Sequence, residues 1–217
     1  MYKYFLKRLM DIVISGIAII VLALPMLIVT IAIKIDDPGP VLFKQKRVGK
    51  KKNGEITYFM IWKFRSMKMC TPHDVPTHLL ENPEKYITRV GRWIRKTSID
   101  ELPQIYQVFS GKLSCVGPRP ALWSQDDLIA EREKYGANDV KPGITGWAQI
   151  NGRDELEIPV KAKFDGEYAT ALNAGGFKGF AMDVNCFFGT FVSVLRSDGV
   201  VEGGTGTMKK EEETVSK

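Results

Sequence analysis

The residues Ile12–Ile33 form the feature that most constrains how this chain folds. They read IVISGIAIIVLALPMLIVTIAI, 22 residues without a charged side chain. A helix crosses the hydrocarbon layer of a bilayer with about 20 apolar residues, so this segment is long enough to enter a membrane. A buried core helix is the alternative, but the segment is apolar on all sides. A cleaved signal peptide fits less well, because no small-residue cleavage site follows.

Two further features bear on how this segment sits in the bilayer. Pro25, near its middle, removes a helical hydrogen bond and predicts a kink or break. Residues 1–52 hold ten lysines and arginines against three acidic residues, and these cations lie on both sides of the apolar segment. Because the positive-inside bias draws both flanks toward the cytoplasm, we expect a re-entrant helix–break–helix over residues 1–36. A straight transmembrane span is the alternative.

The rest of the sequence predicts a small α+β catalytic domain over residues 37–200 and a polar, disordered tail over residues 201–217. Residues 40–67 read as a β-hairpin around Asn53-Gly54, since Asn-Gly is a strong hairpin turn signal. The last apolar helix is amphipathic and fits either the core or a membrane interface. Helical patterns cover residues 87–98, 100–109, 124–135, 158–172 and 180–195.

Charge and cysteine content limit the possible partners and compartments. Three cysteines without a regular spacing indicate a reducing compartment rather than a disulfide framework. The sequence pI of about 9.1 would suit nucleic-acid binding. The basic residues, however, cluster beside the apolar segment, where attraction to anionic lipid explains them better. We therefore expect membrane lipid, and no nucleic acid, as a partner.

Asp100 and Glu101 are the first candidates for chemistry, in the stretch RKTSIDELPQIYQ. As structure, Ser98 and Glu101 fit a capping box, or Asp100 is itself the helix N-cap with Pro103 in the first turn. A carboxylate at a helix N-terminus is also held ionised and oriented by free N–H groups, as a nucleophile or metal ligand must be. Capping and catalysis are compatible interpretations of this pair.

Cationic side chains recur in restrained settings along the chain. Arg119 lies between two prolines, and such a fixed guanidinium suits phosphate recognition. The turn at residues 142–146, PGITG, has the glycines that allow backbone to approach a ligand closely. Together these features predict an anionic, phosphate-bearing substrate beside carboxylates that hold Mg²⁺. The candidate substrate-binding cations are Lys63, Arg65, Arg95, Arg119 and Arg153.

Four stretches resemble the bacterial sugar transferase family, the monotopic phosphoglycosyl transferases. They are DDPGPVLFKQKRVG, IWKFRSM, WIRKTSIDELPQIYQVFSGKLSCVGPRPAL and VKPGITGWAQINGR, and they occur in order along the chain. The resemblance implies transfer of a phosphosugar from a UDP-sugar to polyprenyl (undecaprenyl) phosphate with release of UMP. It places such an enzyme in the bacterial inner membrane, with its catalytic domain on the cytoplasmic face, at the first membrane step of glycoconjugate or polysaccharide biosynthesis.

The resemblance also assigns roles to residues. It implies that Asp100 is the nucleophile of a ping-pong mechanism with a phosphosugar–aspartyl intermediate, and that Glu101 binds Mg²⁺ or assists as a base. It makes Pro25 the break in the membrane helix, and it adds Asp165 and Asp183 to the substrate-binding candidates. A homodimer is compatible with the family. The sugar is not specified by the sequence, and a membrane-anchored interaction protein without activity is the competing hypothesis.

Overall fold

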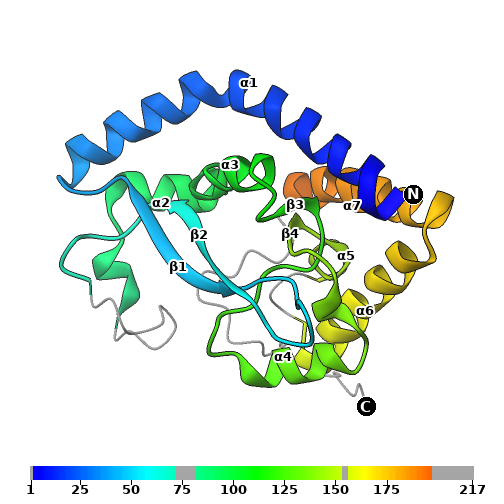
Figure 1. Ribbon diagram of the computed structural model, residues 1–217. Coiled ribbons are helices and arrows are strands. Elements are labelled where there is room, and N and C mark those ends of the chain that lie inside the picture. Colours follow the sequence, from blue (N-terminus) through cyan, green and yellow to red (C-terminus); the bar gives the residue numbers. More distant parts are fainter. Residues whose placement is uncertain (1, 72–81, 153–155, 197–217) are drawn as a thin grey trace, which may run out of the picture.

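The computed structural model describes residues 2–71, 82–152 and 156–196, and these residues form a domain of helices and short strands, as the α+β prediction expected, with one long helix along its side. Figure 1 shows this helix, α1, arching over the domain. A two-stranded hairpin, a second pair of short strands and the remaining helices lie beneath it. Arg153 and the predicted tail over residues 201–217 lie outside the described residues.

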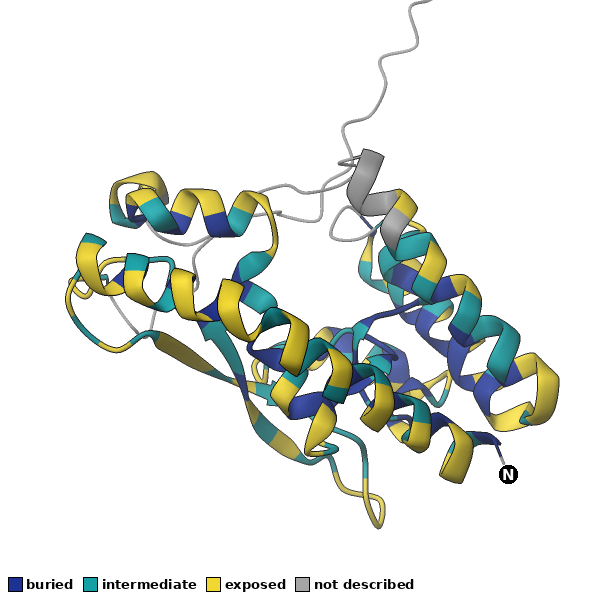
Figure 2. Cartoon of the chain, turned by 90° about the horizontal axis from the view of Figure 1, so that it is seen from above, coloured by how far each residue is buried: buried dark blue, intermediate teal, exposed yellow. Residues whose placement is uncertain are grey.

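Helix α1 spans Lys7–Asp36 and is preceded by one π-helical turn, Tyr2–Leu6. The helix is continuous and has Pro25 within it, so the predicted break is not seen as two separate helices. Figure 1 shows that it is curved along its length. Only 17% of its most apolar 18-residue window is buried, and Figure 2 shows exposed residues along its outer face. The core-helix alternative is therefore wrong, because a core helix would have most of its surface covered.

Both ends of α1 contact the domain. Near the N-terminal end, Lys7 pairs with Asp183 at 2.7 Å and the Asp11 carboxylate accepts from the Cys115 backbone N–H at 2.9 Å. Near the C-terminal end, Val29 and Ile33 pack in a buried cluster with Ile94. The helix thus lies along the domain instead of projecting from it.

The predicted hairpin is confirmed. Strand β1 spans Leu42–Val48 and pairs antiparallel with β2, Tyr58–Phe64, in the register Leu42↔Phe64 to Val48↔Tyr58. At the turn, Asn53 and Gly54 have φ values of 51° and 84°. Positive φ at both central residues is what an Asn-Gly turn provides. The hairpin carries Lys63 near the end of β2, where it faces the candidate site.

Most of the predicted helices are present, with one change at the candidate catalytic pair. The predicted helix over residues 100–109 is a 3₁₀ turn, η4, followed by a shorter α-helix, α3, that begins at Gln104. The helical elements after β2 are η3 Pro83–Tyr86, α2 Arg89–Lys96, η4 Ile99–Glu101, α3 Gln104–Phe109, α4 Asp126–Glu133, η5 Ala137–Asp139, α5 Trp147–Ile150, α6 Ile158–Ala174 and α7 Gly176–Arg196.

A pair of parallel strands, β3 (Ser114–Val116) and β4 (Gly143–Thr145), lies at the centre of the domain and was not predicted. Its glycines allow a close backbone approach. A Cβ atom on Gly143 would lie 2.2 Å from the Gly117 nitrogen, and one on Gly146 would lie 2.3 Å from the Gly117 oxygen. These glycines therefore lie against the backbone after β3, while the close approach to a ligand that the sequence suggested stays a prediction. Their packing fixes the chain just before Arg119.

Candidate active site

Asp100 and Glu101 lie in the 3₁₀ turn η4, between α2 and α3. Ser98 enters this turn with φ of 56°, in the left-handed region, and its side chain makes no capping hydrogen bond. The N-cap position of α3 is Pro103, also without a side-chain cap. Both capping interpretations of the sequence are therefore wrong. The two carboxylates are free of the helix end and point instead toward cationic side chains from other elements.

Glu101 is held by two cations that are far apart in the sequence. Lys63, from β2, donates to Oε1 at 2.8 Å. Arg119, from the loop after β3, donates to Oε1 at 2.7 Å and to Oε2 at 3.3 Å. This forked contact is the geometry in which arginine binds a carboxylate most strongly. Burial acts to raise the pKa of Glu101, but Arg119 and Lys63 outweigh it and hold that pKa well below its ordinary value.

Asp100 has weaker cationic contacts than its neighbour. It is buried, and its closest cation is Lys63 Nζ, 3.6 Å from Oδ2. Burial raises the pKa of Asp100 above its ordinary value; Lys63 opposes this increase, and the nearby Glu101 carboxylate adds to it. The pair therefore combines a firmly ionised carboxylate with a more basic one. Opposite pKa shifts in neighbouring groups are typical of sites where each group has its own role.

Arg95, from the last turn of α2, completes the cationic surroundings of the pair. Its charge acts to lower the pKa of Asp100, after the larger effects of burial, Lys63 and Glu101. Its Nη1 atom is buried and has no hydrogen-bond partner among the described residues. A buried donor without a partner is costly. Arg95 therefore has an unused hydrogen-bond donor in the last turn of α2.

Two predicted substrate-binding arginines lie elsewhere or outside the described residues. Arg65 pairs with Asp37 at 2.7 Å and also donates to the Asp37 backbone oxygen. This contact ties the end of β2 to the end of α1 and uses both terminal nitrogens of the guanidinium, while its Nε is buried without a hydrogen-bond partner among the described residues. Arg153 follows α5 but cannot be placed relative to the catalytic pair.

Asp165 supports the site through a second arginine. It is buried in α6, and its Oδ2 accepts from Arg132 at 2.6 and 2.8 Å. Burial raises the pKa of Asp165, and Arg132 opposes the increase. Arg132 in turn donates to the backbone oxygen of Arg119 at 3.0 Å. Sequence reasoning missed Arg132, because in the sequence it looks like an ordinary helix cation and only its buried position identifies it.

Asp183 belongs to the contact between α1 and the rest of the domain. It lies in α7 and accepts hydrogen bonds from Lys7 at 2.7 Å, from the Tyr2 hydroxyl at 2.5 Å and from the Tyr168 hydroxyl at 2.8 Å. None of these partners surrounds the Asp100–Glu101 pair. The buried Asp11 carboxylate makes a similar contact with β3, through Ser114 and Cys115. Sequence reasoning did not identify Lys7 and Asp11 as contacts between α1 and the domain. Their position as charged residues at the edge of an apolar helix was the signal that could have found them.

Asp100 and Glu101 could hold Mg²⁺ only together with ligands from water and a substrate. Among the described residues, no group of three or more histidine, cysteine, aspartate or glutamate side chains could enclose a metal. Mg²⁺ is commonly held by one or two carboxylates together with water and substrate phosphates. Asp100 and Glu101 fit that pattern, with Asp100 less engaged by cations than Glu101. Such a site is completed by a phosphate-bearing substrate.

Two adjacent carboxylates thus lie within a group of lysine and arginine side chains, in a domain that has a long helix with an apolar outer surface. Such cations suit phosphate recognition. The model of the bacterial sugar transferase family matches residues 2–197. The chain therefore belongs to this family.

Individual relatives support the same assignment. The UDP-glucose:undecaprenyl-phosphate glucose-1-phosphate transferase of Escherichia coli (strain K12) is 39% identical over 176 residues, covering 75% of this chain and 36% of its own. The exopolysaccharide production protein PSS of Rhizobium leguminosarum bv. phaseoli is 39% identical over 200 residues, which cover 88% of this chain and 95% of that protein. The undecaprenyl-phosphate galactose phosphotransferase of Salmonella typhimurium is 36% identical over 209 residues, which cover 90% of this chain and 41% of that protein. The chain spans about a third of the length of several curated relatives it matches.

Proposed function

We propose that this protein transfers a phosphosugar from a UDP-sugar to polyprenyl phosphate and releases UMP. The observation that carries the proposal is the Asp100–Glu101 pair, in which a buried, more basic carboxylate lies beside a firmly ionised one among Lys63, Arg95 and Arg119. Relatives named as glucose and galactose phosphotransferases that act on undecaprenyl phosphate support this reaction class.

In the first half of the reaction, an Asp100 carboxylate oxygen attacks the β-phosphorus of the UDP-sugar. A bond forms between this oxygen and phosphorus, and the bond from phosphorus to the bridging oxygen breaks. The bridging oxygen leaves with its electron pair on UMP, and the sugar phosphate stays on Asp100 as an acyl phosphate. A carboxylate whose pKa is raised is a better nucleophile than an ordinary one, provided that it is ionised.

In the second half, a phosphate oxygen of polyprenyl phosphate attacks the same phosphorus. The bond between phosphorus and Asp100 breaks, the carboxylate is regenerated, and the product is a polyprenyl-diphosphate-linked sugar. The bond between the sugar and its phosphate oxygen is untouched in both halves. This explains why the site needs cations for phosphate and no arrangement to stabilise an oxocarbenium ion.

The cations reduce the repulsion between a carboxylate and a diphosphate. Arg95 has a free buried donor for a phosphate oxygen. Lys63 and Arg119 hold Glu101, and they lie close enough to Asp100 to influence its charge. Bound Mg²⁺ would neutralise further charge on the transferring and leaving phosphates. Glu101 would hold the ion with Asp100.

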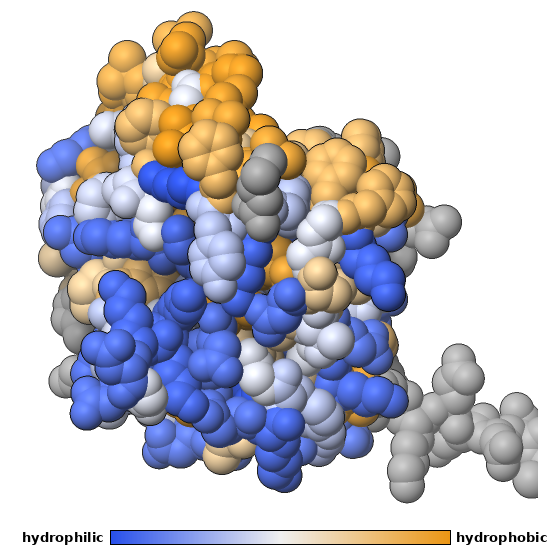
Figure 3. Space-filling view, turned by 45° about the vertical axis from the view of Figure 1, so that its right-hand side comes forward, coloured by the Kyte–Doolittle hydropathy of each residue, from blue (hydrophilic) through white to orange (hydrophobic). Residues whose placement is uncertain are grey.

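The position of α1 supports a monotopic arrangement on the cytoplasmic face of the inner membrane. Figure 3 shows apolar side chains gathered at the end of the molecule formed by α1 and hydrophilic ones over the opposite end. Exposed apolar surface of this extent is typical of a membrane contact. Since both ends of α1 contact the same domain, the helix fits a re-entrant path curved around Pro25 better than a straight span.

The test is UMP release from a panel of UDP-sugars, measured in detergent with undecaprenyl phosphate and Mg²⁺. We expect one or a few UDP-sugars to give turnover, and chelation of Mg²⁺ to abolish it. Asp100→Asn should reduce turnover by roughly a thousandfold or more, because the amide is not a nucleophile. Lys51→Gln, which alters a half-buried lysine of the hairpin loop that pairs with Glu133 and not with the catalytic pair, serves as the control. Near-normal turnover in Asp100→Asn would exclude this residue as the nucleophile.

The same variant separates catalysis from folding. The raised pKa of Asp100 means that its ionised form is less stable in the folded chain than in the unfolded chain. Stability is therefore lost as pH rises from the unfolded pKa through the folded pKa. Above both values, Asp100→Asn should leave the free energy of unfolding unchanged or increase it. If Asp100→Asn is inactive and also unfolds at a lower temperature than the wild type, its loss of activity would not support Asp100 as the nucleophile, because misfolding would explain it.

A further inference from the structure

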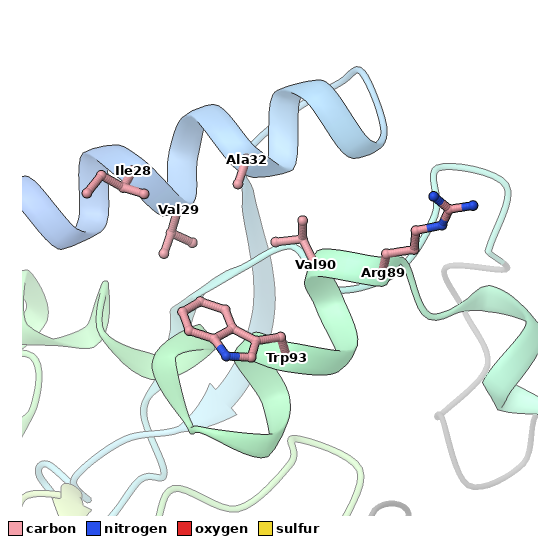
Figure 4. Close-up of a pocket in the computed structure, with 6 residues that line it drawn as sticks. All are labelled: Ile28, Val29, Ala32, Arg89, Val90 and Trp93. Carbon is pink, nitrogen blue, oxygen red and sulfur yellow. The ribbon is translucent and has the colours of Figure 1, made fainter.

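The two helices that flank the catalytic turn meet their neighbours in different ways. Helix α2, before the turn, meets α1 through apolar side chains such as Val29 and Val90, which Figure 4 shows in this contact. Helix α3, after the turn, instead buries two glutamines, Gln104 and Gln107, which are only 2% and 1% exposed. Buried side-chain amides normally have hydrogen-bond partners, so the partners of these two glutamines are informative.

Gln107 has a partner for each end of its amide. Its Oε1 accepts from the Trp62 backbone N–H at 2.9 Å, and its Nε2 donates to the Met60 backbone oxygen at 2.6 Å. Both partners belong to β2. This face of α3 therefore lies against β2, and the protein itself uses the Gln107 amide.

Gln104 differs from Gln107 in this respect. Its Nε2 atom is buried and has no hydrogen-bond partner among the described residues. A buried donor without a partner lowers stability relative to an apolar side chain of similar shape. The contacts within the chain therefore do not explain why an amide donor stands at this position.

Gln104 lies in a row with Glu101 and Gln107. The Ile105 N–H donates to the Leu102 oxygen at 3.0 Å, so bonding between residues three apart continues from η4 into α3. Residues at this spacing share one face of a helix, with Cβ atoms about 5–6 Å apart. The unused donor of Gln104 is therefore one turn away from Glu101.

Both ends of this row are tied to β2. Lys63 of β2 donates to Glu101 at 2.8 Å, and Gln107 binds the backbone of the same strand two turns further along the chain. Gln104 lies between these two contacts. Its amide is thus on the side of α3 that faces Lys63 and the catalytic pair.

We propose that Gln104 Nε2 donates a hydrogen bond to a non-bridging oxygen of the phosphoryl group that Asp100 receives. The inference rests on the proposed function and adds a substrate-contacting residue to it. The transferring phosphorus must come to Asp100, and its oxygens need donors as charge is redistributed in the transition state. Because the amide is buried, its use includes a rearrangement at Glu101, whose two cations, Lys63 and Arg119, also suit the incoming phosphates.

The first measurement asks whether the protein itself needs the amide. Gln104→Met removes the donor and keeps a similar side-chain length, and Gln107→Met makes the same change at the equally buried glutamine that β2 satisfies. In thermal unfolding, Gln104→Met should unfold at the wild-type temperature or above it, and Gln107→Met should unfold at a lower temperature. A lower unfolding temperature in both Gln104→Met and Gln104→Leu would mean that the fold uses this amide, and would overturn the inference.

The second measurement is the burst of UMP without acceptor, which reports transfer to Asp100. It uses a UDP-sugar that gives turnover in the panel. Gln104→Met should lower the rate constant of the burst by about tenfold or more, because the transition state loses one donor. An unchanged rate constant would overturn the inference and leave the proposed function intact. Absence of the burst in the wild type would overturn the proposed function itself.

Sulfur substitution identifies the acceptor atom. The two β-phosphorothioate diastereomers of the same UDP-sugar each replace one non-bridging oxygen by sulfur, a weaker hydrogen-bond acceptor. We expect one diastereomer to slow the wild-type burst, and its effect to be smaller by about threefold or more in Gln104→Met, because the two changes remove the same contact. Equal sulfur effects in the two proteins, with both diastereomers, would overturn the inference and would place the contact of Gln104 on another part of the substrate.

Discussion

Asp100 and Glu101 are adjacent in the sequence, yet their surroundings make them chemically different. Lys63 and Arg119 contact Glu101 at 2.8 and 2.7 Å, whereas the nearest cation to Asp100 is at 3.6 Å. Burial therefore dominates at Asp100, and ion pairing dominates at Glu101. The difference arises because the 3₁₀ turn directs two successive side chains into different environments.

Lys63 gives a pH-dependence prediction at this site. Lys63 opposes the burial-driven increase in the pKa of Asp100, so its removal should raise that pKa further. The nucleophile must be ionised, and activity falls as pH drops through its pKa. In Lys63→Gln, the acidic limb of the kcat/KM profile for the UDP-sugar should therefore move to higher pH. A limb that stays in place or moves to lower pH would contradict this electrostatic role. Lys51→Gln should leave the limb unchanged.

Asp165 gives a stability prediction with an internal control. Asp165 forms a buried ion pair with Arg132. Asp165→Ala would leave this buried arginine unpaired, which should lower the free energy of unfolding by about 3–5 kcal/mol. Glu131→Ala removes a pair with the largely exposed Lys134 and should cost at most about 1 kcal/mol. Denaturant unfolding of both variants measures the difference. Equal, small effects would mean that the buried pair does not support the loop carrying Arg119.

Three of the predicted cations interact with the Asp100–Glu101 pair, and their part in binding a substrate stays a prediction. Lys63 and Arg119 pair with Glu101, and Lys63, Arg95 and Arg119 each act to lower the pKa of Asp100. Arg65 has a similar setting in the sequence but pairs with Asp37. Pairing partners come from tertiary structure, so local sequence could not separate these cases.

At the scale of elements, the hairpin and helices were predictable and the β3–β4 pair was not. The hairpin strands are seven residues long and flank an Asn-Gly turn, which is a strong local signal. Strands β3 and β4 have three residues each and pair across a gap of more than 20 residues. Three residues are too few to show a periodicity, and parallel pairing leaves no turn signal in the sequence.

Gly143 tests the importance of this strand pair. In Gly143→Ala the new Cβ would lie 2.2 Å from the backbone nitrogen of Gly117, so the backbone must shift. We expect a loss of about 1–3 kcal/mol in the free energy of unfolding and a larger loss of turnover, because the shifted segment leads to Arg119. Gly16→Ala is the control: its Cβ would meet only the Phe109 ring, at 3.7 Å. Gly143→Ala with unchanged stability and activity would show that the close approach can relax without cost.

At the scale of the whole molecule, α1 is held to the domain at both ends and presents apolar side chains outward between them. The sequence predicted the apolar segment and its basic flanks, since these are compositional features. It could not predict the contacts of Lys7 with Asp183 or of Ile33 with Ile94, which join residues far apart in the sequence. These contacts decide how the helix lies relative to the catalytic domain.

Cysteine labelling in sealed vesicles tests the re-entrant arrangement. The exposed positions Tyr4 and Pro40 flank α1, and Glu55, in the hairpin turn, serves as the reference for the catalytic domain. Each is changed to cysteine in a Cys70→Ser background, because Cys70 is the exposed native cysteine. The other two native cysteines should label poorly, since burial raises the pKa of Cys115 and Cys186 to about 12 and leaves little thiolate.

With a membrane-impermeant maleimide, all three engineered cysteines should be labelled in inverted vesicles, whose cytoplasmic face is outward, and none in right-side-out vesicles. Two ends on the same side are expected because Lys7 and Ile33 both contact the one catalytic domain. If Tyr4→Cys is labelled from the side opposite to Pro40→Cys and Glu55→Cys, then α1 spans the bilayer. The Lys7–Asp183 pair would then have to break on insertion, and the contacts at the N-terminal end of α1 would not exist in the membrane.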